Sequence, residues 1–490
     1  MPTPADRIRA LNERPLARDR DHVVYWMTAA RRPGSSFALE RAVDLAVELD
    51  RPLIVLEPLR VGYRWASDRF HRFVIDGMAD HAAFFEPRAV AYHPYVEPEA
   101  GAGRGLLAAL GERACAVVTD DWPCFFLPRM QAAAAAALDV RLEAVDGNGL
   151  MPIGRADKAF ARAHDFRRYL HRELPRQLER WPLPDPTANA ALRPATFPED
   201  VAARWPRASD ALLRGDAAAL AKLPIDHGVG VVAERGGFAS GRDLVAQFVD
   251  ERLERYEDRS HPDAEVVSTL SPWLHFGQVS THAIVRAIAD REGWSPAEVD
   301  PKANGNRVGF WGTSVAAEGF LDQLVTWREL GLNMCRYEPG YDRYASLPAW
   351  AKRTLAEHAK DTRPAGYDLA RLEAAQTDDE LWNAAQRELV ETGRMHNYLR
   401  MLWGKKILGW APMPELALAW MITLNDKYAL DGRDPNSYSG IFWVLGRYDR
   451  AWGPERDVFG KIRYMTSDSA RRKLKLKRYL DRWGEAPTLF

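Results

Sequence analysis

The sequence predicts an α/β fold in which a doubly wound parallel sheet is followed by an all-helical region. Three observations lead to this prediction. Between residues 23 and 145 short apolar runs alternate with helical patterns, which is typical of a parallel sheet covered on both faces. After about Ser240 strand signals disappear and apolar residues recur at helical spacing. At 490 residues the chain also exceeds the usual size of one compact core, so two or three domains are expected.

Five short apolar runs predict the parallel sheet. Each lies between segments with helical patterns and has the length of one strand. The runs are VVYWM at 23–27, PLIVLE at 52–57, AVAY at 89–92, CAVVT at 115–119 and VRLEAV at 140–145. We therefore assign residues 1–150 to the α/β domain.

A proline-rich connector is expected after this domain. Six prolines between Trp181 and Pro206 interrupt any long element, so residues 151–235 are assigned to a segment that passes over the surface. Residues 236–490 then form the predicted helical domain. Its helices are expected at 248–256, 281–291, 318–335, 349–360, 379–410 and 415–424.

The composition argues against several classes of protein. A net charge of −1 and a pI of about 6.9 argue against a polycation that coats nucleic acid. Three cysteines without a CxxC pair favour a reducing cytoplasm over a disulfide scaffold, and no metal site is expected. Because the chain has no apolar leader and no run of ~18 apolar residues, neither secretion nor membrane insertion is expected.

A local basic patch is the remaining candidate for binding a polyanion. Between Lys461 and Arg482 nine basic residues accompany two acidic ones, Asp468 and Asp481. A solvated helix face would have the same composition, so the charge pattern leaves both interpretations open.

The α/β domain lacks the motif of a nicotinamide-binding domain. The turn after residues 23–27 reads TAARRPGSS, which is not the glycine-rich phosphate loop. A loose match at Gly228, Gly230 and Ala233 has no strand before it.

The segment VVSTLSPWLHFG at 266–277 is a better candidate phosphate site. Ser271 followed by Pro272 predicts an N-cap and a helix start, where free N–H groups favour anions. Ser268 and Thr269 add hydroxyl groups just before it. A routine helix cap would show the same residues, so this pattern alone is weak.

The C-terminal segment contains the most specific motifs. They are DGRDPN at 431–436, a tryptophan at Trp443, DRAW at 449–452 and FGKIRYM at 459–465. Together they resemble the signature of class II cyclobutane pyrimidine dimer photolyases, and the resemblance extends over nearly the whole chain. It implies a monomeric cytoplasmic flavoenzyme that uses light and reduced FAD to repair ultraviolet-damaged DNA. Residues 1–150 would then be an antenna domain, and the sequence leaves open whether it holds a deazaflavin, a folate, FMN or no chromophore.

The same resemblance implies a set of flavin contacts. Arg400 would pair with Asp431 beside the isoalloxazine ring, where the charged pair stabilises the anionic reduced flavin. Asn425 would face flavin N5, because an amide can accept from a protonated nitrogen or donate to a bare one. The phosphates and ribityl chain would be held by Tyr256, Ser268, Thr269, Leu270 and Ser271.

Tryptophan is abundant, with seventeen in the chain and twelve from Trp273 onward. Trp403 and Trp410 are seven residues apart, which puts them on one helix face about 10 Å apart along its axis. Aromatic residues at this spacing also fill cores, so spacing alone does not distinguish the two roles. The resemblance implies that Trp403, Trp410 and Trp382 relay an electron from solvent to the photoexcited flavin.

A pyrimidine dimer must leave the DNA stack to approach a buried flavin, so an aromatic pocket is expected. Where the family often has a glutamate, this chain has Gln323, four residues before Trp327 and thus on the same helix face. The amide can bind a thymine edge but cannot act as a proton donor, so only the binding role is expected. The resemblance assigns to lesion and DNA contacts Arg259, Gln323, Trp327, Met401, Trp443, Arg450 and Trp452, with Asn425 on the floor.

Two alternatives share this fold and cofactor. A cryptochrome-like blue-light sensor without repair activity would usually have a C-terminal extension, whereas this chain ends soon after its basic cluster. A photolyase for (6-4) products would be expected to present a histidine pair at the pocket, and the segments assigned there have none.

Overall fold

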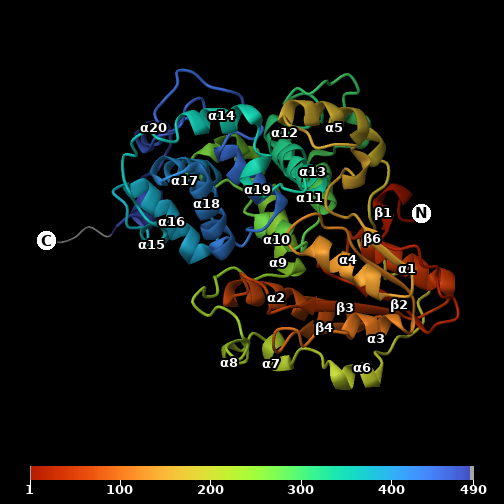
Figure 1. Ribbon diagram of the computed structural model, residues 1–490. Coiled ribbons are helices and arrows are strands. Elements are labelled where there is room, and N and C mark those ends of the chain that lie inside the picture. The colour runs from red at the N-terminus through yellow and green to blue at the C-terminus, as the bar shows by residue number, and fades with distance from the viewer. Residues whose placement is uncertain (1, 486–490) are drawn as a thin grey trace. The chain divides into compact units, whose positions relative to one another are not determined.

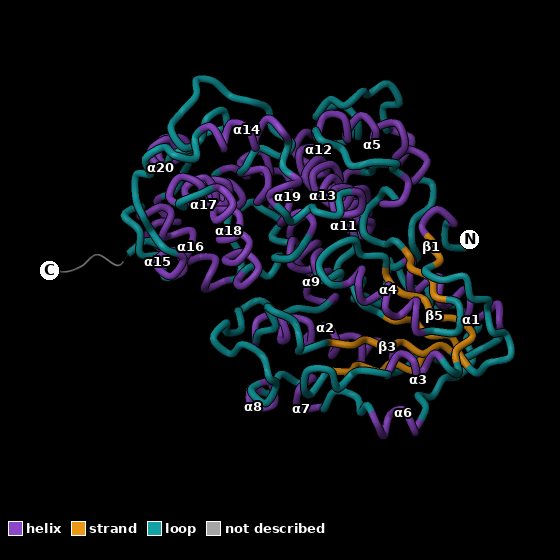
Figure 2. The backbone as a smooth tube through the Cα atoms, viewed as in Figure 1, coloured by secondary structure: helices purple, strands orange, loops and turns teal. Residues whose placement is uncertain are grey.

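The computed structural model describes residues 2–485, which form two compact units. Unit 1 contains residues 1–156, 173–247 and 269–297, and unit 2 contains residues 157–172, 248–268 and 298–490. Strands are found in unit 1, whereas the described part of unit 2 is helices and loops (Figure 2). The predicted order, an α/β region followed by a helical one, is confirmed.

The six-stranded sheet of unit 1 has the order β1-β6-β5-β2-β3-β4. The five predicted runs all form strands, and these pair in parallel. The antiparallel edge strand β1 was not predicted, because three residues are too few to show a periodicity. The strands are β1 Ile8–Ala10, β2 His22–Trp26, β3 Leu53–Leu59, β4 Val90–Val96, β5 Ala114–Asp120 and β6 Leu142–Val145.

Helices cover both faces of this sheet (Figure 1). Val23 and Tyr25 of β2 pack with α1, while Val24 and Trp26 pack on the opposite face with α3 and α4. This alternation is what the period-two geometry of a strand requires when both faces are buried. The helices of unit 1 are α1 Phe37–Leu49, α2 Asp68–Phe85, α3 Leu106–Gly111, α4 Leu127–Ala137, α6 Glu199–Arg204, α7 Asp210–Leu213, α8 Ala217–Leu220, α9 Phe238–Gln247, α10 Ser271–His275 and α11 Thr281–Glu292.

The carboxyl ends of β5 and β2 are joined through one buried carboxylate. Asp120, at the end of β5, accepts hydrogen bonds from the backbone N–H groups of Thr28, Ala29 and Ala30 at 2.8, 2.7 and 2.9 Å. The hydroxyl of Tyr25 donates to its second oxygen at 2.7 Å. Asp120 therefore satisfies the backbone of the turn that follows β2, at the point where the strand order reverses.

The segment assigned to a connector is packed into both units. Residues 157–172 belong to unit 2, and residues 173–235 belong to unit 1. Trp205 lies in the core beside α3, and Leu212 and Leu220 pack in a cluster with α2. The structure thus divides the chain differently from the boundaries expected at 150 and 236, because these short helices bury apolar side chains that the proline pattern did not reveal. The helix α5, Ala163–Gln177, runs through the boundary.

In unit 2 the predicted segments 318–335, 349–360, 379–410 and 415–424 are largely helical. Residues 248–256 form a π-helical turn and part of a 3₁₀ helix instead, and the predicted helix at 281–291 belongs to unit 1. Residues 379–410 form two helices, because Gly393 adopts φ 70° and ends the first of them. Residues 315–337 are helical throughout but contain a π-helical turn at Asp322–Trp327. The helices are α12 Val315–Leu321, α13 Arg328–Tyr337, α14 Ala349–Glu357, α15 Leu369–Glu373, α16 Glu380–Thr392, α17 Asn397–Trp410, α18 Pro414–Tyr428, α19 Pro435–Val444, α20 Ser467–Lys473 and α21 Lys477–Trp483.

Within residues 2–485, no helix combines the length and the apolar character that crossing a bilayer requires.

We expect Asp120→Ala to lower the free energy of unfolding by about 3 kcal/mol, because it leaves three buried backbone N–H groups without an acceptor. Urea unfolding followed by circular dichroism measures this change. Asp139→Ala is the control, since Asp139 is paired with Arg20 at the exposed surface and its loss should leave the unfolding curve unchanged. Equal curves for both variants would contradict the structural role of Asp120.

Candidate functional site

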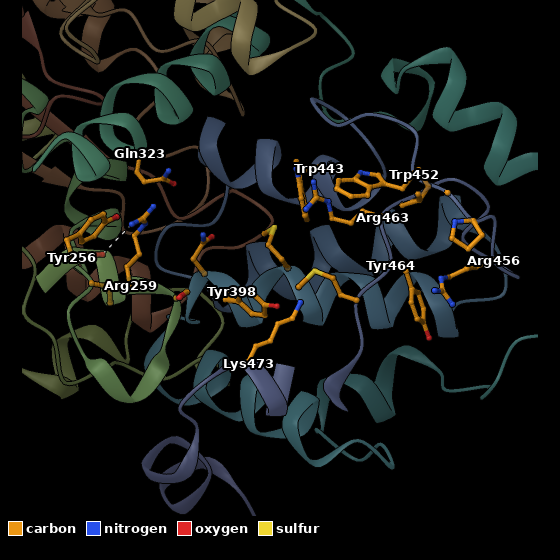
Figure 3. Close-up of a pocket in the computed structure, with 18 residues that line it drawn as sticks. Tyr256, Arg259, Gln323, Tyr398, Trp443, Trp452, Arg456, Arg463, Tyr464 and Lys473 are labelled. Atoms are coloured by element: carbon orange, nitrogen blue, oxygen red, sulfur yellow. Dashed lines mark hydrogen bonds between the residues drawn. The ribbon is translucent and has the colours of Figure 1, made fainter. Parts of the chain in front are cut away.

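A pocket of about 520 Å³ opens in unit 2. Its walls come from the 3₁₀ helix Leu253–Ser260, the π-helical turn, the first half of α17, the end of α19 and the chain that follows α19. Six residues that the sequence assigns to the site line this pocket together (Figure 3): Tyr256, Arg259, Gln323, Met401, Trp443 and Trp452.

One side of the pocket is lined by Trp443, Trp452 and Arg463, which together with their partner Asp449 form a group that we call the tryptophan wall. The guanidinium carbon of Arg463 lies 5.3 Å from the ring centroid of Trp443 and 4.0 Å from that of Trp452 (Figure 3). Asp449 accepts from Arg463 Nε at 3.0 Å and from the indole N–H of Trp452 at 3.1 Å. One carboxylate therefore orients both the cation and an indole ring, and the cation attracts both ring faces.

Asp449 remains ionised in this wall. Partial burial raises the pKa of its carboxyl, but hydrogen bonds from Arg463, the Arg450 backbone and Trp452 outweigh burial, so the pKa is lowered overall. The carboxylate is therefore charged at neutral pH and continues to hold Arg463.

The other side of the pocket contains Tyr256, Arg259 and Gln323 (Figure 3). The buried ring of Tyr256 packs edge-on against Phe248 and Phe320, with centroid distances of 5.9 and 5.2 Å. The guanidinium carbon of Arg259 lies 5.1 Å from the Tyr256 ring, and its Nη1 donates to the Tyr256 carbonyl at 3.4 Å. This hydrogen bond ties the Arg259 side chain to the backbone of the 3₁₀ helix, and Arg259 lines the pocket from there.

Three predicted contacts, Trp327, Arg450 and Asn425, are not among the described residues that line the pocket. Gln323 and Trp327 were expected on one helix face. Both residues lie in the π-helical turn Asp322–Trp327, but of the two it is Gln323 that lines the pocket. Arg450 is exposed, with its guanidinium carbon 4.5 Å from the Trp452 ring. It therefore lies against the tryptophan wall.

The predicted flavin pair is formed between α17 and the turn after α18. Arg400 donates to both oxygens of Asp431, at 3.1 and 3.3 Å, and both side chains are mostly buried. Asn425, six residues before Asp431 in the chain, is buried on α18. Its Nδ2 donates to Asp426 Oδ1 at 3.1 Å and to Ser437 Oγ at 2.6 Å. Because both amide hydrogens are used, the amide oxygen is the group left to meet a ligand.

The three relay tryptophans lie together in the core of unit 2. The rings of Trp382 and Trp403 are parallel within 3° at a centroid distance of 6.5 Å, and Trp382 meets Trp410 edge-on at 5.3 Å. Trp382 therefore contacts both of the others, although the sequence had left its order open. The indole N–H of Trp403 donates to Gln386 at 2.8 Å, and that of Trp382 donates to the Trp403 carbonyl at 3.1 Å.

The helix start expected at Ser271 is displaced by one residue. The helix α10 begins at Ser271 itself, and Leu270 occupies the N-cap position, without a side-chain hydrogen bond. The prediction of a serine cap is wrong because Leu270 already adopts helical dihedral angles, so Ser271 is the first residue of the helix. Thr269, Leu270 and Ser271 belong to unit 1, whereas Ser268 and Tyr256 belong to unit 2.

Several residues of the site were not singled out from the sequence. Arg463 was counted only as part of the basic run, and Gln386 and Lys405 were not considered. Their roles depend on partners distant in the chain. No local sequence pattern indicates which tryptophan ring the cations of Arg463 and Lys405 will contact, or which indole N–H the Gln386 amide will accept from. A signal existed only for Arg463, which lies inside the FGKIRYM motif.

Comparison with known proteins identifies the family. No family model matches the chain. It is 36% identical over 482 residues to the deoxyribodipyrimidine photo-lyase of Methanothermobacter thermautotrophicus, covering 98% of both chains. It is 32% identical to the protein of that name from Potorous tridactylus, covering 95% of this chain and 82% of the relative. The chain belongs to the photolyase family. The crystal structure of a bacterial class III photolyase from Agrobacterium tumefaciens has the same fold, with a TM-score of 0.67 and 17% identity over 95% of this chain and 86% of that one.

Membership of the photolyase family raises the question of whether FAD fits the residues present in unit 2. The chemistry of the donor set fits: a buried Arg400–Asp431 pair offers a fixed charge, and Asn425 offers an amide oxygen whose N–H groups are already occupied. An acceptor in that place suits a protonated ring nitrogen, which is the reduced form of a flavin. Arg400, Asn425 and Asp431 are therefore the residues of unit 2 that would hold the isoalloxazine ring.

We expect Gln386→Leu to lower the free energy of unfolding by about 1–3 kcal/mol, because the buried indole N–H of Trp403 loses its acceptor. Thermal or urea unfolding of the purified variant measures this loss. Gln376→Leu is the matched control, since the Gln376 side chain is exposed and its replacement should change little. If the Gln386 variant were as stable as wild type, the indole would have another acceptor.

Proposed function

We propose that the protein repairs cyclobutane pyrimidine dimers in DNA, in the manner of a class II photolyase and with light as the source of energy. The observation that carries this proposal is the pocket of unit 2, whose tryptophan wall faces Arg259 and Gln323 across a volume of about 520 Å³. The proposal is also supported by relatives named deoxyribodipyrimidine photo-lyase that match nearly the whole chain.

The pocket has the chemistry to receive a dimer that has left the duplex. Trp443 and Trp452 offer large apolar surfaces against which an extruded lesion can pack. Met401 adds an adaptable apolar side chain from α17. Gln323 can donate to and accept from the polar edge of a thymine, but its amide has no acidic proton to transfer.

The residues around the flavin would set its charge and orientation. When bound, reduced FAD would supply the light absorption and the electron that cleaves the dimer. Arg400 balances negative charge in a buried setting, and Asp431 holds that guanidinium in place. The Asn425 oxygen accepts a hydrogen bond, which favours a protonated nitrogen opposite it.

The tryptophan trio supports a route for reducing the flavin. Trp403, Trp382 and Trp410 are in consecutive contact, with centroid distances of 6.5 and 5.3 Å, and all three are buried. Such spacing permits an electron to move from ring to ring, and the order of contacts makes Trp382 the middle member.

Cations at the rim of the pocket would hold the DNA backbone. Arg259, Arg456 and Lys473 line the pocket, and Arg450 is exposed beside the tryptophan wall. Contacts of this kind supply affinity that falls with salt and carries no sequence information, which suits an enzyme that must find a lesion in any sequence.

The test of this proposal is illumination of the purified protein, with its flavin reduced, in the presence of DNA that contains cyclobutane dimers. We expect dimers to disappear in the light and to persist in the dark. Persistence of the dimers under illumination would overturn the repair function and favour a light sensor of the cryptochrome kind. Loss of (6-4) products instead of cyclobutane dimers would overturn the substrate.

The relay is tested separately by Trp403→Phe. We expect this variant to lose light-driven reduction of oxidised flavin by about tenfold or more while still repairing dimers after chemical reduction, because only the route of electron supply is interrupted. Absorption spectroscopy during illumination measures it. Trp420→Phe, a change on α18 outside the trio, is the control and should behave as wild type. Normal photoreduction in the Trp403 variant would remove it from the route.

An antenna chromophore in unit 1 belongs to the same proposal. Absorption of the protein purified from its natural source distinguishes a deazaflavin, a folate and FMN by their band positions. A spectrum accounted for by FAD alone would argue against an antenna.

A further inference from the structure

Lys405, in the middle of α17, is a charged side chain that the proposed function does not use. It is 1% exposed and is among the largest fully buried side chains of the described chain. Burying an ammonium group is costly unless nearby groups compensate for the lost water. A lysine kept in such a place therefore needs partners, and these indicate what it does.

The partners of Lys405 are at the back of the tryptophan wall. Its Nζ donates to the carbonyl of Val444 at 2.6 Å and lies 4.9 Å from the ring centroid of Trp443. Trp443 lines the pocket, as does Met401, one helical turn before Lys405 on α17. The buried ammonium thus contacts the same indole that offers its surface to the pocket.

Close packing leaves Lys405 little freedom to move away from this indole. At the adjacent Gly404 a Cβ atom would lie 2.6 Å from a Val444 methyl group and 3.1 Å from the sulfur of Met421. The helices α17 and α19 therefore approach each other closely, and only a residue without a side chain fits between them. The ammonium is held where the two helices meet.

The charged groups that face Lys405 come from the chain after α19. They are Asp449, which favours the ammonium form, and Arg463, which disfavours it. Burial is the larger effect and lowers the pKa of Lys405 to about 7. The lowered pKa of Asp449 keeps that carboxylate charged at neutral pH, whereas the pKa of Lys405 lies in this range, so Lys405 changes its charge there.

We propose that Lys405 is a positioning residue for lesion recognition, which holds the Trp443 indole in place and draws its π-electron density toward the buried ammonium. A pyrimidine dimer has lost the aromatic character of its two rings and presents carbonyl groups, which pack more favourably on an electron-depleted indole face. The inference rests on the proposed function, because it attributes part of the preference for dimer-containing DNA to the position and electron density of the Trp443 indole.

The test compares the affinities of the full-length protein for dimer-containing DNA and for undamaged DNA of the same sequence, measured in the dark. Lys405→Met keeps the length and apolar stem of the side chain but removes the charge. We expect the ratio of the two affinities to fall about fivefold, the order expected for the loss of a modest cation–π contact. Lys406→Met is the matched control, since Lys406 pairs with Asp379 at 2.8 Å, and its ratio should equal that of wild type.

A purely structural lysine is distinguished by two further measurements. In a Trp443→Leu background, Lys405→Met should have no additional effect on the ratio, because it acts through the indole. In the wild-type protein the ratio should fall as the pH rises through about 7 and the ammonium loses its proton, whereas in Lys405→Met it should not change with pH. The pH profile also tests the proposal if the variant does not fold.

The outcomes separate the role of Lys405 from the proposed function itself. An unchanged ratio in Lys405→Met, an equal loss of affinity for both DNAs, an additive effect in the Trp443→Leu background or a flat wild-type pH profile would each overturn the role of Lys405. If wild type itself did not prefer dimer-containing DNA, the proposed function would fail, and the inference with it.

Discussion

Side chains of α17 contact α16, the turn after α18, the end of α19 and the pocket, so the position of this helix constrains much of unit 2. Arg400 pairs with Asp431 after α18, and Trp403 donates to Gln386 of α16. Lys405 reaches the end of α19, and Met401 lines the pocket. Because successive residues of a helix point about 100° apart, one short segment contributes to the Arg400–Asp431 pair, the tryptophan trio and the pocket at once. A shift of this helix would disturb all three.

Cations on aromatic rings are the second recurring feature of the site. Arg463 contacts Trp443 and Trp452, Arg259 contacts Tyr256, and Lys405 contacts Trp443 from within the core. Such contacts allow a charge to be partly desolvated while the ring keeps its apolar surface. The pocket can therefore be positively charged toward DNA and apolar toward a base in the same small volume.

The pocket and the relay lie on different sides of the same helix. Met401 lines the pocket, whereas Trp403, two residues further along α17, is buried against α16. The indole N–H groups of Trp403 and Trp382 donate to neutral acceptors, a glutamine oxygen and a backbone carbonyl, whereas the indole N–H of Trp452 donates to the carboxylate of Asp449. The Trp452 indole of the pocket is thus held by an ionised partner, whereas those of Trp382 and Trp403 are held by neutral ones.

The sequence by itself determined the order of an α/β region and a helical one, five of the six strands and the family, because apolar periodicity and contiguous motifs are local properties. It also indicated which residues would gather at the pocket, through motifs such as DRAW, and Trp443 and Trp452 do line it. The tertiary structure alone decided that residues 151–235 are packed into both units, that Gln323 lines the pocket whereas Trp327 is not among its described lining residues, and that Trp382 is the middle tryptophan. It also decided the partner of Lys405. These outcomes depend on which side chains meet across helices distant in the chain, and a pattern of neighbours along the sequence does not contain that information.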